Sequence, residues 1–546
     1  MCGFAGALDD ARDRPGWDHL LAGMNDTLAH RGPDDVGTFV DLEAGLGLAH
    51  RRLAVLDLSP GGHQPMVSPG GRFVVAYNGE IYNFEAIRAE LDAGGVTPWR
   101  GHSDTEVVLA GIERWGLEAT VEKCVGMFAF ALWDRVDRAL YLVRDRLGIK
   151  PLYYGDAGRA FVFGSELRAL RRHPEFDATL DRDAIAAYLR HNYVPAPRSI
   201  YRGIRKLEPG RILRVGPGGE RTETVYWSLR ERSAAVRRTP FAGDDREAVD
   251  ELERRIGGAV RDRMVSDVPL GAFLSGGIDS SLVVALLQKA STTPVRTFTI
   301  GFWEEAFDEA PRARAIAEQL GTEHHELRVE PSDALAVIPR LPEMWDEPFA
   351  DSSQVPTYLV SRMARADVTV SLSGDGGDEL FAGYTRYALA REIWGRLGRI
   401  PAPLRRGFAN AIRAVPAPVL DVGLAWTRPW IRRYGSDGRP SDKARKAADL
   451  VGFGGPDEVF LDLVSHFKDP TSLVADSVER SAVLDRWHDA PAGASLTERM
   501  MFVDTVTYLP DDILVKVDRA SMQVSLEARV PLLDHRVVEF AWSLPE

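Results

Sequence analysis

The chain has 546 residues, 45% of them hydrophobic, and a formal net charge of −13 at pH 7. This length favours several domains, and the acidic balance argues against a general nucleic-acid or polyanion binder. Cys2 and Cys124 are too few for a disulfide scaffold, and we see no signal peptide and no apolar run of about 18 residues, so we expect a cytoplasmic protein without a membrane or nucleic-acid partner.

The chain begins Met1-Cys2-Gly3-Phe4. Removal of Met1 would leave Cys2 with a free α-amino group beside its thiol, so one residue would carry both a nucleophile and a base. A cysteine at this position can also be a small buried hydrophobe. Its interpretation therefore depends on the motifs that follow.

Short β-rich runs dominate the first 210 residues. Residues 72–77 form one such run, which we expect to end at an Asn78-Gly79 turn. Residues 126–133 and 139–143 have the pattern of a hairpin, and residues 161–164 are typical of another strand. The first part of the chain is thus predicted to be mainly β-structure with some helices.

Several polar residues in this part suit the recognition of an amino acid. Asn78 and Gly79 offer an amide donor and a backbone N–H, as an oxyanion hole requires. Arg52 could pair with an α-carboxylate, and Asp104 could receive an α-ammonium. Taken singly, the Asn-Gly pair is an ordinary turn, and each charge is a surface residue or a structural ion pair.

Strands alternate with helices in the second part, after a Gly-, Pro- and Arg-rich stretch at 215–245. Helices are expected at 247–264, 282–287 and 310–320, with strands ending near 274, 301 and 372. This alternation predicts a parallel sheet covered on both faces. Residues 387–500 are expected to be helical, and we assign them no chemistry.

The segment 275–281, Ser-Gly-Gly-Ile-Asp-Ser-Ser, lies between a predicted strand and a predicted helix. Backbone N–H groups at such a junction can hold phosphate. The Gly-Lys-Ser/Thr ending of a Walker loop is missing. The segment is similar to the loop of enzymes that split ATP between its α and β phosphates, and Asp279 could help to hold Mg²⁺.

A second glycine-rich loop, 373–384, follows the predicted strand 368–372 and contains Asp375 and Asp378. Loops at the carboxyl ends of parallel strands meet over one crevice. We therefore expect both loops to face one nucleotide, although such a loop alone is more often a solvated turn.

Nine ordered motifs closely resemble those of the glutamine-hydrolysing asparagine synthetases. They occur at residue 2 and at 30–34, 49–53, 78–83, 126–130, 144–153, 275–281, 373–384 and 526–534. The resemblance covers nearly the whole chain and is weakest from about 387 to 500.

The resemblance implies an α+β fold followed by an α/β fold. The first would be an αββα sandwich of the N-terminal nucleophile hydrolases at 1–228. A linker at 229–245 would lead to a parallel-sheet pyrophosphate-loop synthetase domain with helical additions at 246–546. Ammonia released from glutamine would cross an internal tunnel and displace AMP from β-aspartyl-AMP. The substrates would be glutamine, aspartate and ATP, with Mg²⁺, while the oligomeric state, a homodimer included, is left open.

The resemblance also implies residue roles. The catalytic residues would be Cys2, Asn78, Gly79 and Asp375. The glutamine-binding residues would be Arg52, Leu53, Ala54, Val55, Leu56, Asn78, Gly79, Glu80 and Asp104. The ATP-binding residues would be Leu274, Ser275, Gly276, Gly277, Ile278, Asp279, Ser280, Ser281, Ile300, Ser373 and Gly374. The metal ligands would be Asp279 and Asp378.

Two features depart from the family pattern. Some members have Glu where this chain has Asp375, a position linked to adenylate formation; many bacterial relatives carry Asp there. The sequence also stops at Glu546, whereas relatives continue with a segment carrying a lysine linked to adenylation. Either the chain is truncated or its synthetase half is impaired. Lys516 does not match that lysine motif and receives no role.

The alternative interpretations differ in the class of protein or in the acceptor. A paralogue could amidate another carboxylate, and a homologue could be regulatory or scaffolding and catalyse nothing. β-Lactam synthetases and lasso-peptide cyclases use the synthetase loop without ammonia, but they commonly lose the nucleophile that Cys2 provides. Amidotransferases acting on sugar phosphates or phosphoribosyl pyrophosphate share the first domain but lack the loop at 275–281.

Overall fold

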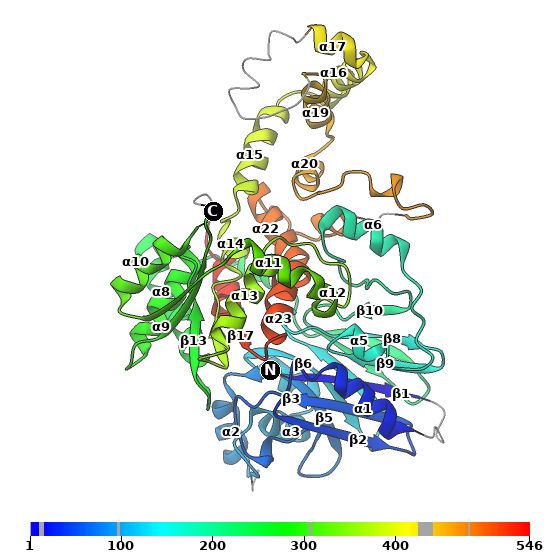
Figure 1. Ribbon diagram of the computed structural model, residues 1–546, viewed down its shortest axis with the longest axis vertical. Coiled ribbons are helices and arrows are strands. Elements are labelled where there is room, and N and C mark those ends of the chain that lie inside the picture. Colours follow the sequence, from blue (N-terminus) through cyan, green and yellow to red (C-terminus); the bar gives the residue numbers. More distant parts are fainter. Residues whose placement is uncertain are drawn as a thin grey trace.

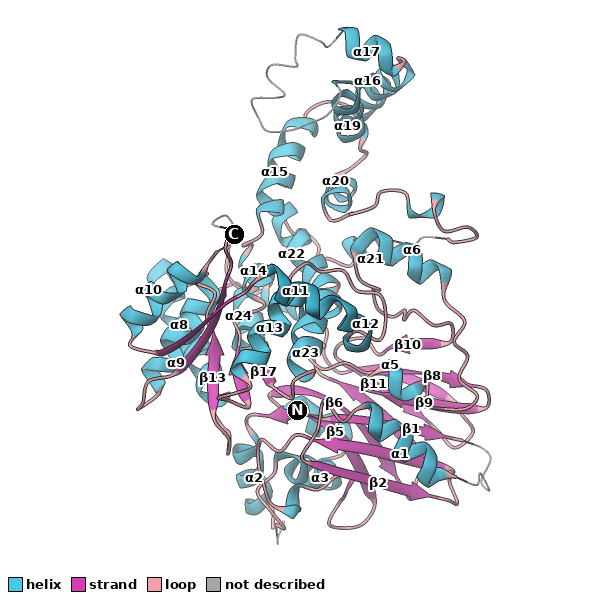
Figure 2. Cartoon of the chain, viewed as in Figure 1, coloured by secondary structure: helices cyan, strands magenta, loops and turns pink. Residues whose placement is uncertain are grey.

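The structure of the chain is a computed structural model that describes residues 2–9, 16–95, 99–304, 308–423, 440–478 and 481–545. The strands gather in two regions (Figure 2). In Figure 1 the N-terminal strands, blue to cyan, lie below the C-terminal helices, and the N-terminus lies beneath α23 (Leu514–Met522). The two parts of the chain therefore meet close to Cys2.

Two six-stranded antiparallel sheets form the N-terminal domain. The first has the order β10-β8-β9-β1-β3-β2, and the second has the order β12-β11-β7-β6-β5-β4. The strands of the first sheet are β1 (Gly3–Leu8), β2 (Asp35–Asp41), β3 (Leu46–Arg52), β8 (Tyr153–Ala157), β9 (Ala160–Gly164) and β10 (Ile204–Lys206). The strands of the second are β4 (Met66–Val67), β5 (Phe73–Ile81), β6 (Gly126–Asp134), β7 (Ala139–Arg144), β11 (Arg211–Val215) and β12 (Arg221–Val225).

Side chains alternate along these strands and build a four-layer sandwich. On β5, Val74 and Ala76 join the core between the sheets, whereas Val75 and Tyr77 join the core beneath helices. The first sheet packs its outer face on α1 and α5, and the second packs on α2, α3 and α4. Their bounds are α1 (Trp17–Thr27), α2 (Phe84–Ala93), α3 (Asp104–Trp115), α4 (Leu117–Lys123) and α5 (Leu167–Leu170). This confirms the expected αββα sandwich.

The expected turn at Asn78-Gly79 is wrong, because both residues lie inside β5. Asn78 is paired with Ala129 and Gly79 with Phe128 on β6. A Cβ atom on Gly79 would lie only 2.2 Å from the carbonyl oxygen of Met127. Cross-strand pairing thus overrides the local turn preference of Asn-Gly, and the glycine serves a close backbone approach.

A five-stranded parallel sheet forms the centre of the C-terminal domain, as predicted, in the order β15-β14-β13-β16-β17. Helices α8, α9 and α10 pack in one core, and α13 and α23 contribute to others. The strands are β13 (Leu270–Phe273), β14 (Arg296–Gly301), β15 (Glu323–Arg328), β16 (Val370–Leu372) and β17 (Glu527–Arg529). The helices are α8 (Asp245–Asp262), α9 (Ile278–Ala290), α10 (Ala310–Leu320), α11 (Pro331–Val337), α12 (Leu341–Met344), α13 (Gln354–Ala364), α14 (Gly377–Phe381) and α24 (His535–Ala541).

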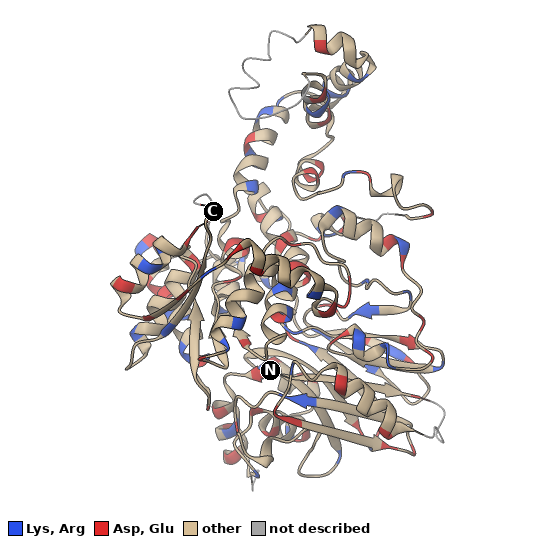
Figure 3. Ribbon diagram, in the orientation of Figure 1, with Lys and Arg blue, Asp and Glu red and all other residues tan. Residues whose placement is uncertain are grey.

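The remaining described α-helices are α6 (Arg182–His191), α7 (Leu229–Val236), α15 (Thr385–Leu397), α16 (Ala402–Ala414), α17 (Ala417–Gly423), α19 (Pro440–Gly452), α20 (Pro456–Leu463), α21 (Ala482–Trp487) and α22 (Leu496–Val506). Among them, α15, α16, α17 and α19 extend upward from the sheets in Figure 2. None of the described helices combines the length and apolarity that crossing a membrane requires. Charged residues of both signs are interspersed along both domains (Figure 3).

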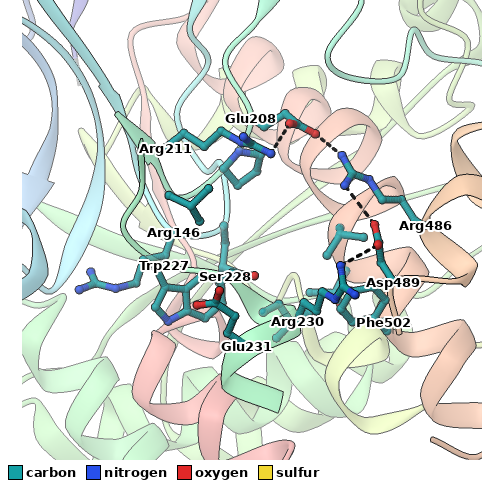
Figure 4. Close-up of a pocket in the computed structure, with 16 residues that line it drawn as sticks. Arg146, Glu208, Arg211, Trp227, Ser228, Arg230, Glu231, Arg486, Asp489 and Phe502 are labelled. Atoms are coloured by element: carbon teal, nitrogen blue, oxygen red, sulfur yellow. Dashed lines mark hydrogen bonds and ion pairs between the residues drawn. The ribbon is translucent and has the colours of Figure 1, made fainter. Parts of the chain in front are cut away.

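A row of alternating charges crosses the seam between the domains, beside a cavity of about 370 Å³ (Figure 4). Glu208, in the N-terminal domain, accepts from Arg211 at 2.6 Å and from Arg486 on α21. Asp489 in turn pairs with Arg486 at 3.4 Å and with Arg230 on α7 at 3.0 Å. These pairs join the two domains.

Candidate active sites

Cys2 precedes β1 and is held from three directions. Its backbone N–H donates to Asn78 Oδ1 at 3.0 Å, and its thiol lies 3.9 Å from the carbonyl oxygen of Leu53. Arg31 Nε donates to the Cys2 carbonyl oxygen at 3.0 Å. Hydrogen bonds to its backbone therefore position the candidate nucleophile. Within the described residues, the sulfur atom itself makes only the weak contact with the Leu53 carbonyl oxygen.

Asn78 carries an unused donor beside the thiol. Its side chain is fully buried, and among the described residues its Nδ2 atom has no hydrogen-bond partner. A buried donor without a partner is costly unless a ligand uses it. An oxyanion formed next to Cys2 would satisfy this amide, which is the role expected of Asn78 and Gly79.

The thiol is not activated by its surroundings alone. Burial raises the pKa of the Cys2 thiol above its usual value, and the positive charges of the N-terminus and of Arg52 offset only part of that rise. A thiol in this state needs a base within reach. The α-amino group that Cys2 would carry after removal of Met1 is such a base.

Of the residues expected to bind the glutamine head group, Leu53 contacts the Cys2 thiol, and the charge of Arg52 acts on it. Leu53, Ala54, Val55 and Leu56 form the loop after β3, and the guanidinium of Arg52 donates to the carbonyl oxygens of Leu56, at 3.2 Å, and Ser59, at 3.1 Å. The Arg52 side chain thus shapes this loop in the structure. Both terminal nitrogens of Arg52 therefore donate to backbone carbonyl oxygens here, including that of Asp57.

Two further residues expected to bind glutamine, Glu80 and Asp104, are buried carboxylates that act on one another's charge. Asp104, the first residue of α3, accepts at 2.9 Å from both the Tyr77 hydroxyl and the Ile81 N–H. Burial raises the pKa of Glu80, and the charges of Glu527 and Asp104 raise it further. An α-ammonium placed between Glu80 and Asp104 would relieve this repulsion.

The phosphate-loop candidate joins β13 to α9. Gly276 has φ of +79°, a conformation that favours glycine. Ser275 Oγ lies 2.9 Å from Ser280 Oγ and accepts from the Gly277 N–H at 3.3 Å. Leu274 and Ile300 lie at the carboxyl ends of neighbouring strands, and the Ile278 side chain is 86% exposed. The loop is therefore preformed at the start of a 13-residue helix.

The second glycine loop packs directly on the first. A Cβ atom on Gly374 would lie 2.6 Å from the Ser280 N atom, and one on Gly377 would lie 2.3 Å from Asp279 Oδ2. The loops follow β13 and β16, which are adjacent strands, and the Ser373 hydroxyl donates to Asp375. In the sheet, β14 and β15 lie on one side of β13, and β16 and β17 lie on the other, so the strand order reverses at β13. Open α/β sheets bind their ligands at such a reversal.

A bound cation would offset the negative charges of Asp279, Asp375 and Asp378, which act on one another where the two loops meet. Burial raises the pKa of Asp279, and the negative charges of Asp378 and Asp375 raise it further. Within the described ranges, no three His, Cys, Asp or Glu side chains form a metal-binding group. Two carboxylates completed by substrate phosphates are a common Mg²⁺ arrangement, so Asp279 and Asp378 fit that ion.

Sequence reasoning missed Lys516, which α23 places beside these loops. Lys516 Nζ donates to Asp351 Oδ2 at 2.9 Å, and although burial lowers its pKa, Asp351 and Asp375 together raise it above its usual value. The local signal was slight, a lysine between Val515 and Val517, and a buried lysine needs a partner.

Glu527 and Arg529 on β17 were also missed as neighbours of Cys2. Glu527 is fully buried, raises the pKa of the Cys2 thiol and accepts from Arg529 Nε at 2.7 Å. Arg529 also lies 3.9 Å from Glu80. An edge strand of the C-terminal sheet thus borders the N-terminal site.

The fold and the two sites define a class: an N-terminal nucleophile amidotransferase domain joined to a pyrophosphate-loop synthetase domain. The glutamine amidotransferase domain model matches residues 1–227, and the asparagine synthase model matches residues 251–546. The chain belongs to the asparagine synthase family, and it is an enzyme of the carbon–nitrogen ligase class.

Relatives that match over all or nearly all of this chain support this assignment. The chain is similar to glutamine-hydrolysing asparagine synthetase 1 of Bacillus subtilis strain 168, with 32% identity over 100% of this chain and 81% of that protein. A putative glutamine-hydrolysing asparagine synthetase of Mycobacterium tuberculosis H37Rv is 34% identical over 100% of this chain and 82% of its own length. A more distant relative, Amidase chry2 of Gibberella zeae, is 27% identical over 95% of this chain and 78% of its own length.

Proposed function

We propose that the enzyme converts aspartate to asparagine with ammonia released from glutamine, forming β-aspartyl-AMP and releasing AMP, pyrophosphate and glutamate. The observation that carries this proposal is the contact between the loops after β13 and β16, in the same chain as a cysteine beside an unpaired amide donor. The proposal extends to a cytoplasmic enzyme that needs neither a membrane nor a nucleic-acid partner.

In the N-terminal site, the α-amino group of Cys2 takes the proton of the thiol as the sulfur atom attacks the side-chain amide carbon of glutamine. Asn78 Nδ2 and the Gly79 N–H stabilise the tetrahedral oxyanion. The C–N bond then breaks, ammonia leaves with that proton, and water hydrolyses the thioester to glutamate. The buried setting of Cys2 keeps bulk water from competing for the intermediate.

In the C-terminal site, the loops at 275–281 and 373–377 hold the phosphates of ATP. The β-carboxylate of aspartate attacks the α-phosphorus, and pyrophosphate leaves. Mg²⁺ held by Asp279 and Asp378 would neutralise phosphate charge during this step. Ammonia, reaching the site through an internal tunnel, then attacks the acyl carbon and displaces AMP. Asp375, which accepts from Ser373, belongs to the loop that positions the adenylate.

The acceptor can be tested by measuring pyrophosphate release with ATP and a panel of carboxylates. We expect aspartate to give a kcat/KM at least about tenfold above that of glutamate, succinate or β-alanine, because one methylene or one missing charged group costs that much in a fitted site. Equal rates for all four would contradict aspartate as acceptor and favour a paralogue acting on another carboxylate.

A further inference from the structure

A cluster of charges lies completely buried between the two domains. Arg31 and Glu166 of the N-terminal domain meet Asp518, Arg519 and Asp346 of the C-terminal domain, and all five side chains are at most 3% exposed. Lys150 Nζ adds a contact of 3.5 Å to Asp518. Buried ion pairs of this kind contribute little net stability, but removing one partner is strongly unfavourable.

Arg31 connects this cluster to the nucleophile. Its Nη1 and Nη2 atoms lie 2.8 and 3.1 Å from the two carboxylate oxygens of Asp518, and its Nη1 also lies 2.9 Å from Glu166. Its remaining Nε–H donates to the Cys2 carbonyl oxygen. Because the guanidinium is planar and rigid, the direction of that last bond is set by the position of Asp518.

The helix that carries Asp518 also carries Lys516. Residues two apart on an α-helix point about 200° away from one another, so they face opposite sides of α23. One side contacts Arg31, and the other contacts Asp351, near Asp375 of the second glycine loop. A π-helical turn at Leu509–Ile513 leads directly into α23, and such turns are frequent at functional sites.

We propose that Asp518 is a positioning residue for Cys2 that acts through Arg31, and that α23 thereby couples occupancy of the adenylation site to the rate of glutamine hydrolysis. This inference rests on the proposed function, since it requires both half-reactions. Ligands that draw Lys516 toward the phosphates shift α23, and the Asp518–Arg31 pair transmits the shift to the Cys2 carbonyl. A displacement of about 1 Å is sufficient to change the rate of attack by as much as about 10²-fold.

The test is the rate of glutamine hydrolysis with and without ATP and aspartate, in the wild type and in Asp518→Asn. In the wild type we expect the ligands to raise kcat/KM for glutamine by a factor within the usual allosteric range, about 5- to 150-fold. Asp518→Asn keeps the shape but places an amide N–H against Arg31. We expect its basal kcat/KM to fall about tenfold and its response to ligands to disappear.

Two further variants separate positioning from general damage. Arg486→Gln breaks another interdomain charge pair, the one with Glu208, and should leave both the basal rate and the ligand response unchanged. Arg31→Lys keeps the charge but loses the fork, so it should reproduce the Asp518→Asn phenotype, and the two changes combined should be clearly less than additive. Ammonia-dependent pyrophosphate release should stay within about twofold in every variant, which also shows that each protein is folded.

The possible failures are distinguishable. A wild type that hydrolyses no glutamine would refute the proposed function itself. A wild type that hydrolyses glutamine without any response to ATP and aspartate, or an Asp518→Asn enzyme that keeps the full response, would overturn the inference alone. The inference would also be overturned if Arg486→Gln lost as much basal rate and ligand response as Asp518→Asn, because breaking any interdomain ion pair would then have the same effect. If Asp518→Asn does not fold, the inference is tested with Arg31→Lys instead, by its rates of glutamine hydrolysis with and without ATP and aspartate.

Discussion

The variant Cys2→Ala should lose glutamine-dependent amidation while retaining amidation with ammonium salts. Only the release of nitrogen from glutamine needs the thiol, which lies beside Asn78 and Leu53 in the N-terminal domain, whereas the phosphate loops follow β13 and β16 of the C-terminal domain. Removing an essential nucleophile costs at least about 10³-fold. The measurement is asparagine formation with glutamine or with ammonium chloride at pH 8.5, where more ammonia is unprotonated.

Cys124→Ala is the matched control, because Cys124 is the other buried cysteine and packs in the core under α3 and α4. It should keep both activities. Two results would contradict the assignment of Cys2: retention of glutamine-dependent activity in Cys2→Ala, or loss of the ammonia-dependent activity in a folded Cys2→Ala protein. The second result would mean that the two sites are not chemically separate.

The variant Asp279→Asn should stop ATP-dependent pyrophosphate release but leave glutamine hydrolysis in place. Asp279 lies against Gly377 of the second loop, and its pKa, raised first by burial, is raised further by Asp378 and Asp375. An amide of the same size keeps the packing but removes the charge that the cation needs. We expect a fall of about 10²-fold or more, measured by coupled pyrophosphate detection.

Glu253→Gln is the control for this prediction, since Glu253 is an exposed carboxylate on α8 that pairs with Lys289 of α9 at 2.8 Å. It removes a charge from the same layer without touching either loop, and it should change no rate. Raising the magnesium concentration should partly restore Asp279→Asn. Unchanged pyrophosphate release in Asp279→Asn would show that the metal lies elsewhere.

Local patterns predicted the parallel sheet and both of its loops well. Strand-like runs ending near 274 and 372, each followed by glycines, place the loops at the carboxyl ends of β13 and β16. Two strand-like runs separated by the polar turn residues 134–138 also predicted the β6–β7 hairpin. These features depend on neighbouring residues, which is why a single sequence was sufficient to find them.

Features that depend on distant pairing were not predictable in this way. Asn78-Gly79 has the sequence of a turn, yet pairing with β6 keeps it extended. The contact between Arg31 and Asp518 spans 487 residues, and nothing near either residue indicates it. Lys516 illustrates the same limit, because its partner Asp351 lies in a different part of the chain. Packing of the two domains, rather than local propensity, decides these positions.

The central claim is that nitrogen passes from glutamine at Cys2 to an aspartyl adenylate made at a second site. The most direct measurement supplies amide-¹⁵N glutamine, aspartate and ATP together with unlabelled ammonium at low concentration, and follows the products by mass spectrometry. The account predicts asparagine carrying ¹⁵N in its side-chain amide, with AMP and pyrophosphate formed in equal amounts. Formation of ADP and phosphate, or glutamate release with no ¹⁵N in any amide product, would contradict it.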